Sequence, residues 1–505
     1  MNVVFVNPTD NIWGQGVNIL ASILRDRKHT VRTVYLPSLK NNVIKFDKDD
    51  WLSNFGDADI YLVSFMSNSL PRAIEFTRFI KGAVPGIPVV WGGVHPTAMP
   101  EDSLSYVDYV GRAECEEALP EFLERFEKGL DMTDVRNFWV RGKNGAIFRN
   151  PTRPPVDNLD SLPVNDYGID NKYLVHMGKI APMTVELLTH YIVDYPIGRP
   201  LFYTMTSRGC PFFCSYCYNA KLNKEHGYGK IRKRSLKKVI SEEVKPALEK
   251  FPFFRNMVLM SDDDFLNRGI KDLRDFCTLW KKDVKVPFAC LATPSSISRE
   301  KMDALMDAGL RILEIGVQTG SERINESIYD RHSANKAVLD KMRVLKEYVN
   351  KKKLLVICDF IIDNPYEKDD DIKKSISLYL DIPFRSEVNF FALTPYPGTP
   401  IHERMKNDGL IKDDYEEFAR EFSLSTKKSY RYLTLLFIMK GKFARWIPGT
   451  IVRLLSSWPM IFLGNAATRF FFTPMLRSRV MRRIGRNMAE RGALLYGHVL
   501  DKETA

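Results

Sequence analysis

Three cysteines stand within eight consecutive positions of this 505-residue chain, in the stretch TSRGCPFFCSYCYNAK. The spacing is C-x3-C-x2-C, formed by Cys210, Cys214 and Cys217. Three thiolates this close on one loop can converge on one metal centre. Structural zinc sites need four ligands and most iron–sulfur clusters use four cysteines, yet the next cysteine, Cys277, comes sixty residues later (277 − 217). Either His226 completes a zinc site, or the centre is a 4Fe-4S cluster with one iron left open to a substrate or cofactor.

The composition is typical of a multidomain globular protein. The length suggests about three domains, and 45% hydrophobic with 27% charged residues can bury a core. The seven cysteines are not spaced as a secreted disulfide framework, and the N-terminal MNVVFVNP predicts a β-strand rather than a signal peptide. We therefore expect a cytoplasmic protein whose cysteine cluster serves metal or redox chemistry. The remaining cysteines in apolar contexts are expected in the core: Cys277, Cys290 and Cys358.

Alternating strands and helices predict two α/β domains. Short apolar runs separated by helical patterns in the first 100 residues favour a doubly wound parallel sheet, whose ligand would lie at loops 8–16, 64–69 and 92–97. Residues 150–167 contain four prolines and predict a linker. Six further strand-like runs between 200 and 400 favour a partial (β/α)6 barrel. The expected domains are 1–149, a linker 150–199, a barrel 200–425 and a helical C-terminal segment 426–505.

The net charge of +12 is concentrated in that C-terminal segment. Between Lys427 and Arg491, fourteen Lys and Arg accompany one acid, which gives +13 and leaves about −1 elsewhere (12 − 13). The longest charge-free run, Leu454 to Thr468, has 15 residues and falls short of the ~20 needed to span a bilayer. Its mixture of cations and aromatic residues favours an amphipathic helix on an anionic membrane surface. A helical cap over the barrel is the equal alternative, whereas nucleic acid fits poorly because the apolar content is high.

The cysteine segment resembles the radical S-adenosylmethionine (SAM) superfamily, whose signature places an aromatic residue, here Tyr216, before the last cysteine. Further motifs follow in the family's order: SDDDF (261–265), LEIGVQTGSERI (313–324), DFIIDNPYE (359–367) and LTPYPGTP (393–400). In the third motif, Asp359 and Asp363 replace both glycines of the family pattern. The resemblance implies a cluster held by the three cysteines, an open iron that binds SAM, and a 5′-deoxyadenosyl radical. The SAM-contacting residues that it implies are Tyr216, Asp262, Asp263, Gln318, Thr319, Ile362 and Pro365. An acid at a strand end can instead cap the next helix.

The N-terminal domain is similar to the cobalamin-binding domain of cobalamin-dependent radical SAM enzymes, through WGGVHPTAMPEDSL (91–104) and VGRAECEEAL (110–119). The D-x-H-x-x-G motif that supplies an axial histidine in many cobalamin proteins is absent, and the first loop reads TDNIWGQG. The resemblance implies a cobalamin site at Asn11, Trp13, Gly14, Gln15, Ser64, Met66, Gly92, Gly93, His95 and Glu114. As alternatives, these glycines are ordinary turn residues, His95 is a hydrogen-bonded loop histidine, or the domain binds no cobalamin.

Together these resemblances predict an oxygen-sensitive methyltransferase that uses a 4Fe-4S cluster, SAM and methylcobalamin on an unactivated carbon of a lipophilic substrate. The expected partners are that small molecule, an electron donor such as flavodoxin or ferredoxin, and a peripheral anionic membrane at its inner face. A cyclase or carbon–carbon bond-forming enzyme, with cobalamin in another role, keeps the same fold. A metal-stabilised binding protein at the membrane surface, without turnover, is the alternative from another class.

Overall fold

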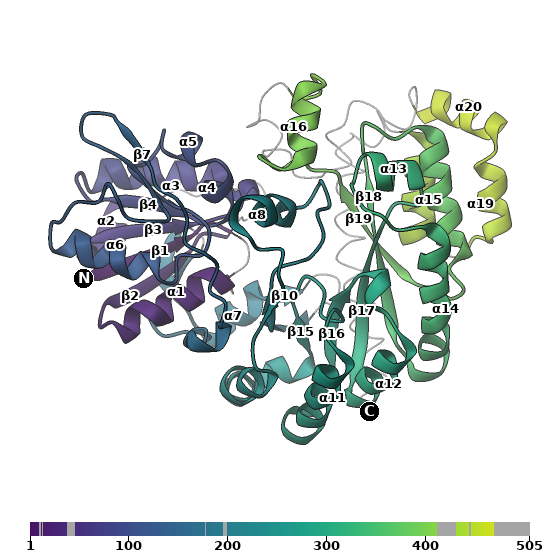
Figure 1. Ribbon diagram of the computed structural model, residues 1–505, viewed down its shortest axis with the longest axis horizontal. Helices are drawn as coiled ribbons and strands as arrows, with labels where there is room; N and C mark the ends of the chain where they lie inside the picture. The colour runs from purple at the N-terminus through teal and green to yellow at the C-terminus, as the bar shows by residue number, and fades with distance from the viewer. Residues whose placement is uncertain are drawn as a thin grey trace.

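The computed structural model describes residues 1–9, 12, 14–37, 46–176, 178–194, 199–411, 431–443 and 446–468. Asn11 and Trp13, two of the predicted cobalamin residues, and the basic stretch after residue 468 lie outside these ranges. Figure 1 shows two α/β lobes side by side, the N-terminal one in purple and blue and the second in teal and green. The predicted fold class, a parallel sheet domain followed by a partial barrel and helices, is confirmed.

The N-terminal lobe is one nine-stranded sheet in the order β7-β6-β5-β4-β3-β1-β2-β8-β9. Its strands are β1 (Asn2–Asn7), β2 (Thr30–Tyr35), β3 (Ile60–Ser64), β4 (Val89–Gly92), β5 (Tyr109–Gly111), β6 (Phe138–Arg141), β7 (Ile147–Arg149), β8 (Lys172–His176) and β9 (Lys179–Pro182). β1 runs parallel to both β2 and β3, so the chain order reverses there. In doubly wound sheets the ligand crevice lies at this reversal, beyond the carboxyl ends of the strands.

Both faces of this sheet are covered, which explains why β1 is buried over almost its whole length. The covering helices are α1 (Gln15–Asp26), α2 (Lys48–Phe55), α3 (Leu70–Ala83), α4 (Val94–Ala98), α5 (Pro100–Ser103) and α6 (Ala118–Glu127). The segment 150–199, expected to be a linker, contributes β8 and β9 to one edge of the sheet and then forms α7 (Val185–Tyr191). Its proline-rich first part carries no strand or α-helix.

The second lobe is a six-stranded, all-parallel sheet in chain order, the open barrel that the sequence predicts. Its strands are β12 (Phe202–Thr204), β15 (Val258–Met260), β16 (Phe288–Ala292), β17 (Leu310–Gln318), β18 (Leu355–Ile362) and β19 (Glu387–Ala392). Its helices are α8 (Tyr218–His226), α9 (Leu236–Lys238), α10 (Lys245–Lys250), α11 (Ile270–Leu279), α12 (Arg299–Ala308), α13 (Glu322–Ser327), α14 (Asn335–Lys352), α15 (Asp369–Asp381) and α16 (Pro400–Asn407).

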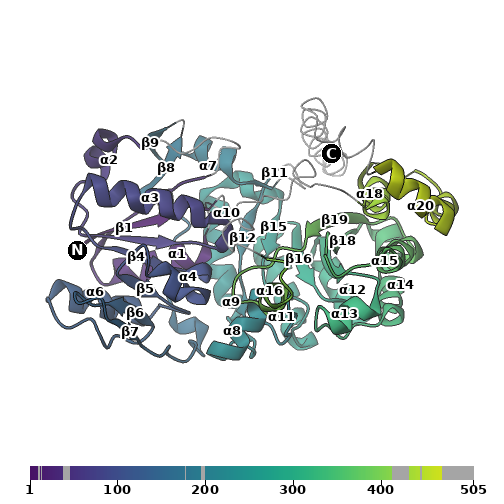
Figure 2. The same cartoon turned by 90° about the horizontal axis from the view of Figure 1, so that it is seen from above.

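Two short ladders and three C-terminal helices complete the fold. The ladders pair β10 (Val193–Asp194) with β11 (Arg199–Pro200), and β13 (Ser207–Arg208) with β14 (Arg232–Lys233). The helices are α18 (Tyr432–Ile438), α19 (Gly449–Leu455) and α20 (Trp458–Ala467); Figure 1 shows α19 and α20 at the outer side of α15, and Figure 2 shows α18 beside it. Cys277, Cys290 and Cys358 are buried, as predicted.

Candidate active site between the two lobes

The cysteine loop is held by backbone contacts on both of its sides. It begins at Gly209, where φ is +96° and a Cβ atom would lie 2.6 Å from the Tyr228 carbonyl oxygen, so only glycine fits. The Asn223 side chain donates to the carbonyls of Cys210 (2.7 Å) and Phe212 (3.0 Å). The Ser215 N–H donates to the Tyr329 carbonyl at 2.8 Å. The loop is thereby fixed between β13 and α8. Figure 1 shows α8 between the two lobes.

The three cysteines are half-buried and close enough for their charges to interact. Burial raises the pKa of the Cys210 thiol to about 12 and that of Cys217 to about 11, so both are protonated unless a cation stabilises their thiolates. In the described part of the chain, no three His, Cys, Asp or Glu side chains are already arranged around a point as metal ligands. The donor set still fits a 4Fe-4S cluster, because three thiols share one anchored loop that opens toward the other lobe.

The zinc alternative loses its fourth ligand in the structure. His226 ends α8, whereas the cysteines precede its first residue, so the nine-residue helix separates them by about 13 Å. The His226 side chain is buried beside Thr152, whose hydroxyl lies 3.2 Å from Nδ1. Burial, followed by the charge of Arg112, lowers its pKa to about 4. His226 therefore belongs to the packing at the far end of α8.

Asp263 is the acid of the SDDDF motif that faces the cysteines. Its charge acts on both Cys210 and Cys217, and its side chain is exposed. Burial by the surrounding protein nevertheless raises its pKa, against a hydrogen bond from Asn219, as expected for a side chain at the base of an open cleft. A carboxylate in this position can accept charge-assisted hydrogen bonds from a ligand ammonium group.

Asp262, predicted alongside it, has a different place. Its side chain is fully buried and accepts from the Thr206 N–H (3.1 Å), the Thr206 hydroxyl (2.9 Å) and the Ser207 hydroxyl. Burial raises its pKa, although these hydrogen bonds and the charge of Arg268 act in the opposite direction. Asp262 therefore fastens the start of the cysteine segment to β15 and does not face the cleft. Both acids lie beyond β15, which ends at Met260; Asp262 is buried against Thr206 and Ser207, whereas Asp263 is exposed in the turn that follows.

Arg331, a residue that the sequence did not single out, links Tyr216 to the strand that carries Gln318. Arg331 donates to the Tyr216 hydroxyl at 3.2 Å and to the carbonyl of Gly316. Gln318, at φ +73°, ends β17 after an irregularity in its pairing with β18, and its amide nitrogen lies 2.7 Å from where a Gly316 Cβ would be. The side chain thus lies over Gly316 on the inner face, where it can hydrogen-bond a ligand hydroxyl.

The other three residues of the predicted SAM site are less available. Thr319 is buried, with its hydroxyl 3.1 Å from that of Ser375 and accepting from the Ser321 N–H. The Ile362 side chain is buried at the carboxyl end of β18, and Pro365 is exposed in the loop that follows. These positions shape the strand end, and their part in SAM binding remains a prediction.

The predicted cobalamin residues gather at the carboxyl edge of the N-terminal sheet. Ser64 and Gly92 are register partners at the ends of β3 and β4, Gly14 precedes α1, and Met66 is 48% exposed just beyond β3. A Cβ on Gly92 would meet nothing closer than 3.7 Å. Small and exposed side chains therefore border the crevice at the β1–β3 reversal, which fits a large flat ligand approaching the backbone.

Gly93 and His95 serve the loop itself. Gly93 has φ +93°, and a Cβ there would lie 2.8 Å from the Phe65 backbone nitrogen and oxygen. The His95 ring is buried, stacks on Phe65 and has Nδ1 3.0 Å from the Ser67 hydroxyl. Burial lowers its pKa to about 4, so His95 is neutral at physiological pH. The structure thus places His95 in the first turn of α4, packed against the loop that follows β3.

Glu114 and Gln15 join the two lobes. Glu114 receives two hydrogen bonds from Arg232 (2.7 and 2.8 Å) and lies 3.2 Å from the Arg208 guanidinium. Gln15 donates to the Tyr203 carbonyl at 3.2 Å and accepts from Tyr167 at the same distance. Their contacts with cobalamin stay a prediction, and the hydrogen bonds that the structure shows for them are with the protein. We call the group of Glu114, Arg208 and Arg232 the clamp. The sequence could not reveal it, because Glu114 and Arg232 are 118 residues apart.

The clamp makes stability depend on pH in a defined direction. Burial acts to raise the pKa of Glu114, but the hydrogen bonds from Arg232 and the charges of both arginines outweigh it and lower the pKa below its ordinary 4.5. The contribution of Glu114 is therefore complete above about pH 4.5 and is lost as the pH falls through its lower folded-state pKa. We expect Glu114→Gln to unfold about 3 kcal/mol more easily at pH 7, with the difference from wild type shrinking in acid.

Thermal or urea unfolding from pH 7 down to pH 3 measures this effect. Glu101→Gln is the matched control, because the Glu101–Arg149 pair of 2.7 Å is exposed and should change stability little. A Glu114→Gln variant that is as stable as wild type at pH 7 would contradict the clamp.

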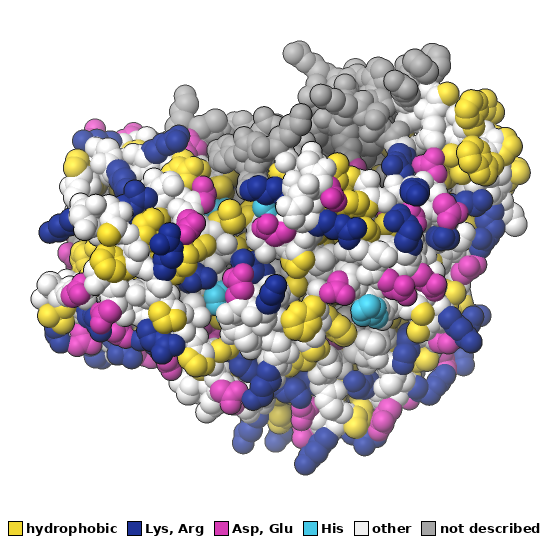
Figure 3. All heavy atoms as spheres, turned by 45° about the horizontal axis from the view of Figure 1, so that its top comes forward, with side chains coloured by type: hydrophobic (Ala, Val, Ile, Leu, Met, Phe, Trp, Pro, Cys, Tyr) yellow, Lys and Arg dark blue, Asp and Glu magenta, His cyan; other side chains and the backbone are white. Residues whose placement is uncertain are grey.

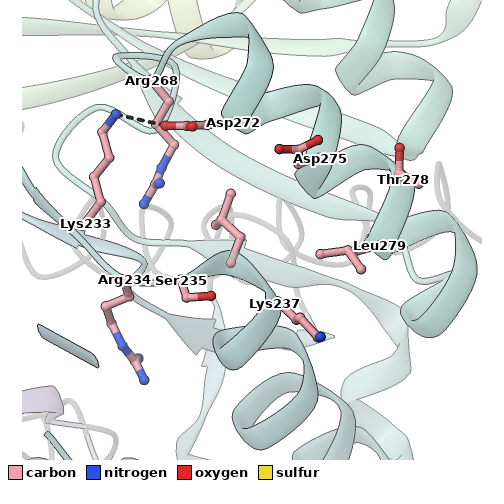
Figure 4. A pocket seen from close by; sticks show the side chains of 10 residues that line it. Lys233, Arg234, Ser235, Lys237, Arg268, Asp272, Asp275, Thr278 and Leu279 are labelled. Carbon is pink, nitrogen blue, oxygen red and sulfur yellow. Dashed lines mark hydrogen bonds and ion pairs between the residues drawn. The ribbon is translucent and has the colours of Figure 1, made fainter. Parts of the chain in front are cut away.

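A basic pocket of about 650 Å³ lies apart from this site, between α9 and α11 (Figure 4). Three of its four cations are engaged by the protein, since Lys233 pairs with Asp272 at 2.9 Å, Arg234 pairs with Glu243 at 2.5 Å and Arg268 binds backbone. Arg268 donates to the Thr206 carbonyl at 2.6 Å. These pairings give the pocket a role in holding α9 and β14, and it is not part of the candidate active site.

Comparison with known proteins agrees with this division of the chain. Residues 204–379 match the radical SAM superfamily, and residues 2–123 match the B12 binding domain. An uncharacterized methyltransferase of Pyrococcus horikoshii is 24% identical over 80% of this chain and 81% of its own. The anaerobic magnesium-protoporphyrin IX monomethyl ester cyclase of Rubrivivax gelatinosus is 22% identical over 83% and 72%.

A solved structure shares the arrangement of both domains. The radical SAM methyltransferase TsrM of Kitasatospora setae, with cobalamin and a [4Fe-4S] cluster bound, superimposes with a TM-score of 0.62 at 17% identity, over 81% of this chain and 78% of its own. At that identity the likeness concerns the fold. The two domain matches confirm the predicted cofactor classes. The chain therefore belongs to the radical SAM superfamily and is an enzyme of the type that carries a B12-binding domain ahead of the radical SAM barrel.

Proposed function

We propose that this enzyme methylates an unactivated carbon of a lipophilic substrate, in the cleft between its two lobes. The observation that carries the proposal is that the cysteine loop adjoins the carboxyl edge of the B12-binding domain. Tyr218 directly follows Cys217 in the chain, and its hydroxyl lies beside Ser67 of the N-terminal lobe. The Tyr228 hydroxyl accepts a hydrogen bond of 2.8 Å from the Glu114 N–H. When bound, the cluster with SAM supplies a carbon-centred radical and cobalamin supplies the methyl group.

The chain's own residues position and shield these reactants. The Asp263 carboxylate accepts hydrogen bonds from the ammonium group of SAM, and the Gln318 side-chain amide forms hydrogen bonds with its ribose hydroxyls. Arg331 holds Tyr216 against β17, so the cysteine loop and the strand keep one relative position. No general acid or base is needed for these binding roles.

A lipophilic substrate fits the exposed apolar side chains around the cleft. Four apolar side chains are between 37% and 50% exposed. Two of them lie in the cysteine loop (Phe212 and Phe213), one lies at the edge of the N-terminal sheet (Met66), and one lies near the end of β19 (Phe391). Exposed apolar side chains at converging loops gain free energy when a ligand covers them. This supports a largely apolar substrate body.

Product mass separates methylation from cyclisation, the reaction named for one relative. With SAM carrying a deuterated methyl group, each turnover should add one labelled methyl to the substrate. A product that lacks the label, formed with loss of hydrogen alone, would favour the cyclase. Candidate substrates can be drawn from lipid extracts of the source cells and compared with and without SAM.

We also propose that the C-terminal helices dock on an anionic membrane. α19 and α20 pack on the outer side of the barrel through buried Val452 and Ile461, and Arg453 pairs with Asp381 at 2.6 Å. Their other side forms an aromatic face of residues that are 60–82% exposed: Trp446, Leu454, Trp458, Phe462 and Leu463. This face is the apolar area at the upper right of Figure 3. Among the described residues, no helix has the length and apolarity to cross a bilayer.

The two interpretations of this segment, packing on the barrel and docking on a membrane, are compatible, because the helices pack on the barrel with one side and present an apolar face with the other. Trp and Phe on an exposed helix face, next to a segment of net positive charge, suit the interface of an anionic bilayer. We expect the full chain to co-sediment with phosphatidylglycerol vesicles more than with phosphatidylcholine vesicles. Replacing Trp446, Trp458 and Phe462 by serine should release it.

The matched control replaces two exposed apolar residues of the N-terminal lobe, Leu130→Ser and Phe148→Ser. This control should sediment as wild type does. Equal sedimentation of the triple variant and wild type would exclude the aromatic face as the docking surface.

A further inference from the structure

Three polar side chains form one layer inside the barrel. Glu314 lies on β17, Asp359 on β18 and Asn389 on β19, and Asp359 is the register partner of Asn389. Two residues earlier on the first two strands are Ile312 and Ile357, which belong to an apolar cluster with residues of the neighbouring strands. Because alternate residues of a strand share a face, the polar layer lies on the inner face, directly above this apolar floor.

The two carboxyl groups of the layer are close enough for a hydrogen bond between them. The Asn389 amide donates to Glu314 Oε1 at 3.2 Å. Burial, and then the charge of Glu314, raises the pKa of Asp359 to about 9. Two close carboxyls in a buried place cannot both ionise near neutral pH, so the pair holds one proton and one negative charge.

That charge is not balanced inside the layer. The Asp359 side chain is only 9% exposed, and its Oδ1 receives no hydrogen bond from any donor in the described ranges. The charge of Lys442 acts on Asp359 from an exposed position on the segment Met439–Phe443. A buried carboxylate oxygen without a donor is costly, unless a ligand supplies one.

Access and sequence both point to a ligand. Glu314 and Asn389 are half-buried, and Phe391, the next inner residue of β19, is 49% exposed, so the layer is not sealed from solvent. Gln318 is four residues further along β17, or about 13 Å away, which a small molecule can span. In the motif DFIIDNPYE, Asp359 replaces a glycine of the radical SAM pattern. This chain therefore has an acidic side chain inside the barrel at a position where the pattern has none.

We propose that Asp359, with Glu314 and Asn389, binds a cationic nitrogen of the substrate, such as a primary ammonium group. The inference rests on the proposed function, since it assigns the barrel interior to the substrate. An ammonium group supplies both the hydrogen bond that Oδ1 lacks and the positive charge that the pair lacks. A hydroxyl supplies only the hydrogen bond, and a carboxylate supplies neither. The substrate is thus an apolar molecule that carries one basic nitrogen at its deepest point.

Binding of decylamine and decanol to the full chain tests this assignment, because the two probes share an apolar tail and differ in the head group. Calorimetry at pH 7 should show that wild type binds decylamine about ten- to a hundredfold more tightly, the usual value of one charge-assisted hydrogen bond. Asp359→Gly, which restores the glycine of the motif, should lose this preference and bind decanol as before. In Asp359→Asn the one negative charge stays on Glu314, which Asn389 already hydrogen-bonds, so the ligand meets a neutral Oδ1 and most of the preference should be lost. Asp340→Asn, at an exposed acid of α14, is the control and should keep the wild-type preference.

Equal affinities of wild type for the two probes, or an unchanged amine preference in Asp359→Gly, would overturn the inference. If Asp359→Gly does not fold, Asp359→Asn and the wild-type comparison decide in the same way. Iron and cobalt analysis of the same preparations keeps the proposed function separate. Wild type with both metals but no amine preference contradicts only this inference, whereas wild type without the metals contradicts the proposed function.

Discussion

Replacing any one of Cys210, Cys214 or Cys217 by alanine should remove the iron–sulfur cluster from the reconstituted enzyme and reduce its cleavage of SAM to background. The physical reason is that the site has three protein thiolates and no protein substitute for a lost one. His226 lies about 13 Å away along α8, and Asp263 is placed for the SAM ammonium. The cluster absorption band, iron per chain and 5′-deoxyadenosine are the measurements.

Cys277→Ala is the matched control, because this buried cysteine belongs to α11 and lies outside the loop. It should cost about 1 kcal/mol of stability or less while iron content stays at the wild-type level. A Cys214→Ala enzyme that retains the full cluster and cleaves SAM would contradict the assignment of the three ligands.

The second large effect separates two adjacent acids. Asp262→Ala should destabilise the fold by about 3–5 kcal/mol, because it leaves the buried donors of Thr206 and Ser207 and the Arg268 charge without their acceptor. Asp263→Asn should leave the unfolding midpoint almost unchanged, since its side chain is exposed. It should instead weaken SAM binding about tenfold or more, because a charge-assisted hydrogen bond is lost.

Urea unfolding and equilibrium binding of SAM to the reconstituted variants measure the two effects independently. The reverse result, a stable Asp262→Ala that fails to bind SAM beside an Asp263→Asn that binds normally, would assign the ammonium contact to Asp262. The sequence proposed both acids for this role, and the structure favours one of them.

The sequence features that predicted correctly are local ones. Each of the six barrel strands lies in a stretch rich in apolar residues that the sequence shows without tertiary information, and the cysteine spacing is equally local. The choice between Asp262 and Asp263 was not local, because both lie beyond the end of β15 at Met260 and only the contacts of Asp262 with Thr206 and Ser207 separate them.

Non-local pairings were beyond prediction from one sequence. The prolines after residue 150 suggested a linker, but β8 pairs with β2, which lies more than a hundred residues earlier in the chain. Glu114 was assigned to cobalamin through a family pattern, yet it holds Arg208 and Arg232 between the lobes. Arg331 was missed because a single arginine in a loop has no distinguishing pattern until Tyr216 is brought beside it.

One chain should hold an iron–sulfur cluster with SAM in the barrel and cobalamin in the N-terminal domain. Metal analysis with absorption spectra of the anaerobically purified and reconstituted full chain tests it most directly. We predict about four iron atoms and about one cobalt atom per chain. The triple variant Cys210→Ala, Cys214→Ala, Cys217→Ala should lose the iron and keep the cobalt, since the two sites lie on different domains. Zinc in place of iron, or wild-type protein that binds no cobalt when cobalamin is supplied, would contradict the claim.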